Sequence, residues 1–183
     1  EGIEIKYVPP EDIIKKSGAE LFRLWVASTE FRSDIPYSQT ALYGNDGKGG
    51  LAEWYRKLRN TARFLLGNLK GFDPNRYTRD HVAEHGLVVD QYMLGQVDAF
   101  VRTTRDAYEK YELHVVHREL VELVTVDLSA LYGDVTKDRL YSDAEDSPRR
   151  RAAQVVMYEA LRAIVTVAAP ILSFTAEDIW QYM

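Results

Sequence analysis

The chain has 183 residues, of which 46% are hydrophobic and 28% charged, as in a soluble globular domain large enough to bury a core. It has no cysteine, which excludes disulfides, thiolate metal sites and a cysteine nucleophile, and no apolar run reaches the roughly 18 residues of a membrane span. Its formal net charge is −5, so any contact with nucleic acid has to come from a local basic surface.

Residues 1–43 are predicted to form a connector made of a short strand and helices. Apolar and polar residues alternate as far as Pro9, which indicates the strand. A helix is expected from Glu11 to Lys16, and a second one begins after Gly18. The sequence GNDGKGG at residues 44–50 has four glycines in seven positions, which predicts a mobile loop.

Residues 51–183 are predicted to form an antiparallel bundle, so the fold class is all-α. Apolar residues at three- and four-residue steps predict long helices over residues 51–69, 87–111, 113–140 and 148–169. The segment 75–86 is polar and is expected to be irregular. Ser147 and Thr175 are expected to cap the last long helix and a short final one. Long amphipathic helices joined by short turns are typical of a bundle.

The polar side of the helix over residues 51–69 is strongly basic. It carries a stripe of residues at three- and four-residue steps, with one lysine beside it: Arg56, Lys57, Arg59, Asn60 and Arg63. Guanidinium groups bind phosphates in a bidentate way and stack on bases, and an asparagine amide can read a base edge. The stripe is therefore a candidate RNA surface. The alternative is a solvated face whose charges pair with neighbouring helices.

Arg59 has two candidate roles. It lies at the margin of the apolar face, and a half-buried arginine needs a partner. Asp127 is one candidate partner, because it is predicted to lie on the inward side of its own helix beside Val124 and Leu131. Arg59 is therefore expected either to pair with Asp127 or to contact RNA.

Two weaker basic clusters follow. Lys137 and Arg139 lie in the segment TKDRLYSD, and three arginines at 149–151 begin the next helix. Cations are unfavourable at a helix N-terminus, so either the nearby acids Glu145 and Asp146 offset the three arginines or they bind an external anion.

Motifs for catalysis are missing from the sequence. There is no nucleophile elbow, no phosphate-cradling glycine loop and no His-Glu-x-x-His pair, and the four histidines lack further ligands for zinc. No catalytic residue, no metal site and no cofactor is predicted within this chain.

Four segments, taken in order, resemble isoleucyl-tRNA synthetases, which are class I aminoacyl-tRNA synthetases with a helical anticodon-binding domain. The segment after the family's second ATP-binding signature is similar to PPEDIIKKSGAELFRLWVASTEFRSDI at residues 9–35. The opening helix of the anticodon-binding domain is similar to YRKLRNTARFLLGNLKGFDP at residues 55–74. The third bundle helix and the closing segment are similar to VDLSALYGDVTKDRLYSD at 126–143 and AAPILSFTAEDIWQYM at 168–183.

The resemblance implies that the chain is the tRNA-binding part of a longer cytoplasmic enzyme that attaches isoleucine to its tRNA with ATP and Mg²⁺. The implied partners are isoleucine-accepting tRNA and the catalytic and editing domains of the same protein. Both ATP-binding signatures are missing here, so this part is expected to bind tRNA without catalysing. The candidate tRNA-binding residues are Arg56, Lys57, Arg59, Asn60, Arg63, Lys137 and Arg139. The alternatives are a valyl-tRNA synthetase fragment and a helical protein-interaction module that does not bind RNA.

Overall fold

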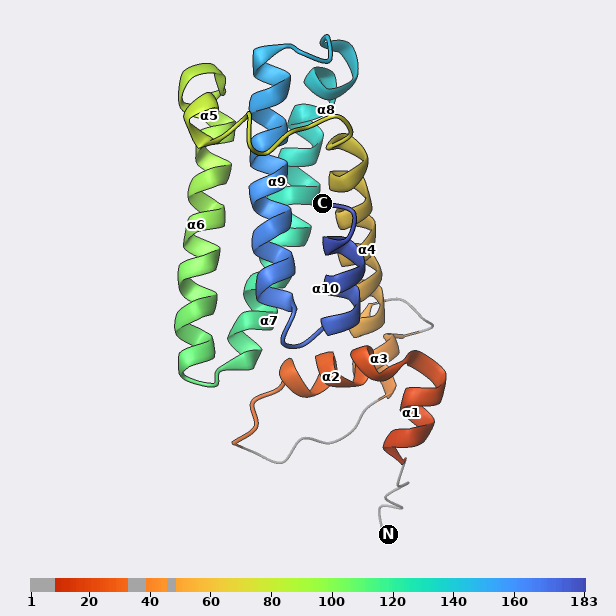
Figure 1. Ribbon diagram of the computed structural model, residues 1–183. Helices are drawn as coiled ribbons and strands as arrows, with labels where there is room; N and C mark the ends of the chain where they lie inside the picture. Colours follow the sequence, from red (N-terminus) through yellow and green to blue (C-terminus); the bar gives the residue numbers. More distant parts are fainter. Residues whose placement is uncertain (1–8, 33–38, 46–48) are drawn as a thin grey trace, which may run out of the picture.

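A computed structural model describes residues 9–32, 39–45 and 49–183 and confirms the predicted all-α antiparallel bundle (Figure 1). Three helices of the connector lie at one end of the bundle: α1 (Pro10–Ser17), α2 (Ala19–Ala27) and α3 (Gln39–Tyr43). The long helical paths are α4 (Gly50–Asn68), α6 (Val88–Glu109), α7–η1–α8 (Leu113–Glu122, Leu123–Tyr132 and Gly133–Ser142) and α9 (Pro148–Ala168). Successive paths run in opposite directions (Figure 1). The expected N-terminal strand and part of the expected glycine-rich loop fall outside the described residues.

Two short helices complete the fold, and each departs from the prediction. Residues 79–85, expected to be irregular, form α5 (Arg79–His85), which packs on α9 through the buried Val82. The final helix, α10 (Ser173–Trp180), begins two residues before Thr175, so Thr175 is not its cap. Contacts with distant parts of the chain thus produce α5 and set the start of α10, and local signals in the sequence predict neither.

The third helical path changes its winding in the middle. Over η1 the backbone is π-helical, and the amide of Gly133 donates to the carbonyl of Leu128, five residues earlier. A Cβ on Gly133 would lie 2.9 Å from that carbonyl oxygen, so glycine fits this close approach. The wider turns rotate the inward face by one residue. Tyr132 is therefore fully buried, while Leu131, expected to point inward, is exposed.

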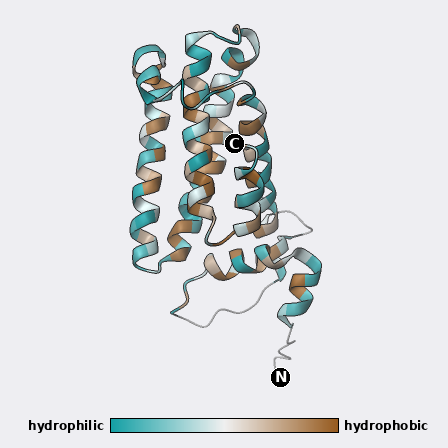
Figure 2. Ribbon diagram, in the orientation of Figure 1, coloured by the Kyte–Doolittle hydropathy of each residue, from teal (hydrophilic) through white to brown (hydrophobic). Residues whose placement is uncertain are grey.

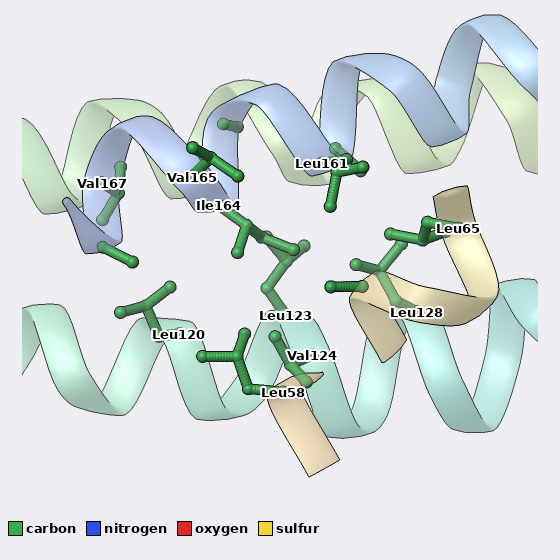
Figure 3. Close-up of a cluster of buried hydrophobic side chains, with 14 of the residues drawn as sticks. Leu58, Leu65, Leu120, Leu123, Val124, Leu128, Leu161, Ile164, Val165 and Val167 are labelled. Carbon is green, nitrogen blue, oxygen red and sulfur yellow. The ribbon is translucent and has the colours of Figure 1, made fainter. Parts of the chain in front are cut away.

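The hydrophobic core lies where α4, α7–η1 and α9 face one another (Figure 3). Hydrophilic and hydrophobic residues alternate along the long helices, as expected of amphipathic helices in a bundle (Figure 2). The side chains that meet in the core are Leu58, Leu65, Leu120, Leu123, Val124, Leu128, Leu161 and Ile164. Each buried leucine contributes about 1.5–3 kcal/mol relative to an exposed one, so this seam sets the position of α4.

A buried ion pair between Asp90 and Arg139 joins α6 to the α7–η1–α8 path at one end of the bundle. Their relative exposures are 0% and 3%. Arg139 donates to the two carboxylate oxygens of Asp90 at 2.6 and 2.8 Å, and the hydroxyl of Tyr132 donates to the same carboxylate at 2.6 Å. The amide of Leu87 donates to it at 2.7 Å, which caps α6. Burial, together with the Asp90 charge, raises the pKa of Tyr132 well above its usual range, so its hydroxyl stays a donor.

At the opposite end, α2 holds the turn between α9 and α10. One carboxylate oxygen of Glu20 accepts hydrogen bonds from the amides of Phe174 and Thr175 at 2.8 and 3.1 Å, and the other accepts from the Thr175 hydroxyl at 2.6 Å. Arg23 donates to the carbonyl of Ile171 at 2.9 Å. Glu20 thus supplies the N-terminal cap of α10 from a helix about 150 residues earlier, which a local reading of the sequence cannot predict.

Replacing Asp90 with alanine is expected to lower the free energy of unfolding by about 3–5 kcal/mol, because it leaves the Arg139 charge buried without a partner. Urea denaturation followed by circular dichroism measures this change. Lys137→Ala is the matched control, since Lys137 lies only two residues from Arg139. Its ion pair with Asp134 is exposed and therefore weak, so the change should leave stability almost unchanged. A small loss for Asp90→Ala would show that the pair does not hold the paths together.

Candidate nucleic-acid interface

The predicted basic stripe lies on the outer, exposed side of α4. All five of its predicted members are exposed, namely Arg56, Lys57, Arg59, Asn60 and Arg63. The opposite side of the same helix buries Trp54, Leu58 and Leu65. Packing of these apolar residues against the bundle turns the basic side toward solvent, as the helical spacing predicts.

Arg56 and Arg63 are available for an external ligand. Neither has a hydrogen bond, ion pair or ring contact with any residue in the described ranges, so their guanidinium donors face water. Lys57 differs, because its Nζ lies 3.6 Å from the Glu53 carboxylate one turn earlier. Exposed pairs of this kind are weak, so an anion can compete for Lys57 at little cost.

Arg59 does not pair with Asp127, so the pairing that the sequence suggested is wrong. Its guanidinium donates to the Tyr55 hydroxyl at 3.3 Å and lies over the Tyr55 ring. That hydrogen bond raises the pKa of Arg59, and the Asp178 carboxylate adds to the effect. Asp127 is half-buried on η1, where burial first and then the Glu122 charge raise its pKa. The π-helical winding changes the direction of Asp127, which explains the error.

Lys137 lies near the stripe although 74 residues separate it from Arg63 in the sequence. Two adjoining hollows of about 360 and 260 Å³ run between α4 and the η1–α8 path. Lys57 lines one, Lys137 lines the other, and Asn60 lines both. The structure therefore brings three of the predicted residues to one groove, with two cations and an amide along its walls.

A separate hollow lies on the other side of α4, toward α10. It has a volume of about 650 Å³, and Arg59 and Arg63 contribute to its wall. Tyr182, which is 80% exposed, and Gln181 lie on the α10 side. The stripe thus borders a groove on each side of α4 rather than a single flat surface.

Arg139, predicted as a tRNA contact, does not lie on this surface. Its guanidinium is buried and paired with Asp90, and its Nε is buried too. Two residues along an α-helix correspond to a rotation of about 200°, so Lys137 and Arg139 point to opposite sides of α8. Because α8 turns Lys137 to the solvent, it turns Arg139 into the core.

The three arginines at the start of α9 contact parts of the chain itself. Arg149 donates to both carboxylate oxygens of Asp143 at 2.6 Å, which lowers the pKa of Asp143. Arg150 and Arg151 donate to backbone carbonyls, those of Asp143 and Gly71, at 3.0 Å. Their unfavourable position on the helix dipole is offset internally, by Asp143 instead of the acids that the sequence suggested.

The sequence reasoning missed two exposed arginines on α6, Arg102 and Arg105. They are three residues apart on the polar side of the helix, and this spacing was the signal that could have found them.

No group of three or more metal-ligating side chains occurs in residues 9–32, 39–45 and 49–183. Across the same ranges, no helix has the length and apolar character needed to cross a membrane.

The structure is a helical-bundle domain with an exposed basic stripe on α4, and comparison with known proteins identifies its family. The sequence model of one protein family, the anticodon-binding domain of tRNA ligases, matches residues 90–183, so the chain belongs to that family. It is 45% identical over 177 residues to an isoleucine–tRNA ligase of Syntrophotalea carbinolica and 43% identical over 177 residues to one of Brevibacillus brevis. Each match covers 96% of this chain and 18% of the relative.

Arg59 and Asp127 are expected to behave independently in a double-mutant cycle. Because the two side chains are not in contact, the coupling free energy between Arg59→Ala and Asp127→Ala should lie within about 0.5 kcal/mol of zero. Urea denaturation of the parent chain, both single variants and the double variant measures it. A coupling well above that value would restore the pairing suggested by the sequence.

The raised pKa of Asp127 is expected to make the free energy of unfolding fall as the pH rises. Its pKa is higher in the folded protein than in the unfolded chain, so the folded state binds more protons between the two values. The free energy of unfolding therefore decreases as pH increases from the ordinary carboxyl pKa through the raised one. Denaturation of the parent chain and Asp127→Asn between about pH 3 and pH 7 checks this. A difference between the two proteins that does not change with pH contradicts it.

Proposed function

We propose that this chain binds the anticodon arm of isoleucine tRNA on the outer side of α4. It is proposed to do so within a cytoplasmic isoleucine–tRNA ligase whose other parts use ATP and Mg²⁺ and supply catalysis and editing. Membership of the anticodon-binding family and the similarity to isoleucine–tRNA ligases support the proposal. The chain spans 18% of those relatives, and no residue of it is assigned a catalytic role.

The observation that carries the proposal is the pair of unpartnered arginines on α4. Arg56 and Arg63 are seven residues apart, two helical turns, so they present guanidinium groups about 10 Å apart along one side of the helix. Phosphates along an RNA strand can accept from both guanidinium groups, and a charge-assisted contact to phosphate is stronger than a neutral one. Neither arginine has to give up an internal partner to make such a contact.

The groove beside α4 gives the proposed surface more than charge. Asn60 lies between Lys57 and Lys137, so an RNA strand that follows the groove would meet a cation, an amide and a second cation in turn. The hydroxyls of Thr61 and Ser129 are 3.0 Å apart at its floor and hold α4 against η1. Cations position a nucleic-acid backbone, whereas an amide can distinguish one base edge from another. Asn60 is accordingly the proposed reader within this groove.

A protein-interaction module is the competing function, and salt dependence separates the two. RNA contacts release counterions, so with about four phosphates contacted the slope of log K against log salt should be roughly −3.

Arg56→Ala and Arg63→Ala should each weaken binding of isoleucine tRNA by about tenfold, since each removes a hydrogen bond to a charged group. Both should leave the free energy of unfolding unchanged. Filter binding or fluorescence anisotropy at two salt concentrations measures the affinity.

Arg118→Ala is the matched control, because Arg118 is exposed on α7, pairs with its neighbour Glu119 and is not a member of the stripe on α4. It should bind tRNA as the parent chain does. Valine tRNA in parallel tests the isoleucine assignment, and tighter binding of isoleucine tRNA is expected. Equal affinity of all three arginine variants for tRNA, or a flat salt response, contradicts the proposed α4 contact.

A further inference from the structure

Arg56 and Arg63 on α4 stand out because they have no partner within the described residues, and a second pair of arginines on another helix shares this property. Within the described residues, every other arginine contacts a carboxylate, a carbonyl, a hydroxyl or an aromatic ring of the chain, except Arg102 and Arg105. These two lie on α6, three residues apart and both exposed. In Figure 1, α9 and α10 lie between α6 and α4, so this pair belongs to a different surface.

Arg102 and Arg105 border a groove between α6 and α9. Its volume is about 850 Å³, and Val97 and Val101 give it an apolar floor on the α6 side. Trp180 of α10 also lines the groove, and 51% of this side chain is exposed. An exposed indole and two unpartnered guanidinium groups in one groove suggest a binding surface, because tryptophan and arginine are enriched among the residues that contribute most to binding energy.

The acids in the groove are mostly neutralised by other arginines. Arg79 donates to Asp98 at 2.9 Å and to Glu159 at 3.1 Å, and Arg162 donates to Glu159 at 3.1 Å. Asp106 is the remaining acid of the lining, and it has no partner in the described part of the chain. Four arginines thus face three acids in the lining, a net charge of 4 − 3 = +1, in a chain whose total is −5.

A single-stranded RNA segment matches this combination of groups. Its phosphates can accept from the two guanidinium groups, while an unstacked base lies on the indole face. An acidic peptide would use the arginines but would leave the indole without a flat partner. Duplex RNA would present its phosphates with its bases already stacked, so it too would leave Trp180 unused.

We propose that the α6–α9 groove binds a single-stranded RNA segment, with phosphates on Arg102 and Arg105 and one base stacked on Trp180. The site is separate from the α4 contact and goes beyond it. That the ligand is RNA rests in part on the proposed function. An RNA that occupies both surfaces would therefore gain affinity from two independent pairs of arginines.

Tryptophan fluorescence gives a direct test, because Trp180 is the most exposed of the three tryptophans. The 183-residue chain is titrated with a single-stranded oligouridylate of about eight nucleotides, within the site sizes of single-strand binders. Quenching is expected in the parent chain and is expected to disappear in Trp180→Phe, which retains a stacking ring and so binds by anisotropy. Trp180→Ala should weaken binding by about fivefold or more.

The double variant Arg102→Ala/Arg105→Ala should abolish the quenching and reduce the salt slope by about 1.4, at about 0.7 for each single-strand phosphate contact. Arg56→Ala/Arg63→Ala is the matched control and should leave oligouridylate quenching intact while it weakens tRNA binding. Quenching that survives the α6 variants, or that persists in Trp180→Phe, overturns the groove proposal. If the parent chain shows no oligouridylate quenching while tRNA binding is lost on α4 substitution, the proposed function stands and the groove proposal alone is overturned.

Discussion

The buried pair of Asp90 and Arg139 is the interaction on which the arrangement of the bundle depends. Taking both charges out of water costs several kcal/mol each, and the cost is offset only because the carboxylate accepts hydrogen bonds from Arg139, Tyr132 and Leu87. Those donors come from α8, η1 and the start of α6. A shift of one helix against another would break several of these bonds together, so the pair favours one register.

The pair also determines which way α8 faces. Arg139 can reach Asp90 only if that side of α8 lies in the core, and the helical rotation then sends Lys137 outward to the groove beside α4. At the other end, Glu20 and Arg23 of α2 hold the α9–α10 turn. Since α10 forms a wall of the hollow at α4 and contributes Trp180 to the α6–α9 groove, the connector shapes both surfaces from a distance.

The parts of the structure that could be predicted from the sequence are those with strong helical periodicity. The apolar positions of α4, α6 and α9 repeat over several turns, and the exposed side of α4 follows directly from them. The segment of α5 contributes one buried residue, Val82, and so has no periodic signal. The π-helical winding of η1 shifts the inward face from Leu131 to Tyr132, and a pattern that assumes 3.6 residues per turn cannot show this.

The site was partly predictable for a related reason. Helical spacing identifies which residues share a side of one helix, so the stripe on α4 was found, but it does not identify partners on other helices. The sequence places Arg139 at the surface because its partner, Asp90, lies 49 residues away and cannot be identified from spacing. The sequence leaves the partner of Arg149 open, because its contact with the Asp143 carboxylate forms only in the folded chain.

The negative net charge of the chain restricts how it can bind RNA. At physiological salt, exposed charges are screened beyond about 8 Å, so the overall charge of −5 does little to prevent a contact that is made at close range. It does remove the general attraction that a basic protein has for any nucleic acid. Affinity then has to come from the few cations whose charge the protein does not use internally. Because most arginines already contact the chain itself, the unpartnered ones on α4 and α6 are the cations left for the proposed RNA contacts, and the folding of the bundle decides which arginines those are.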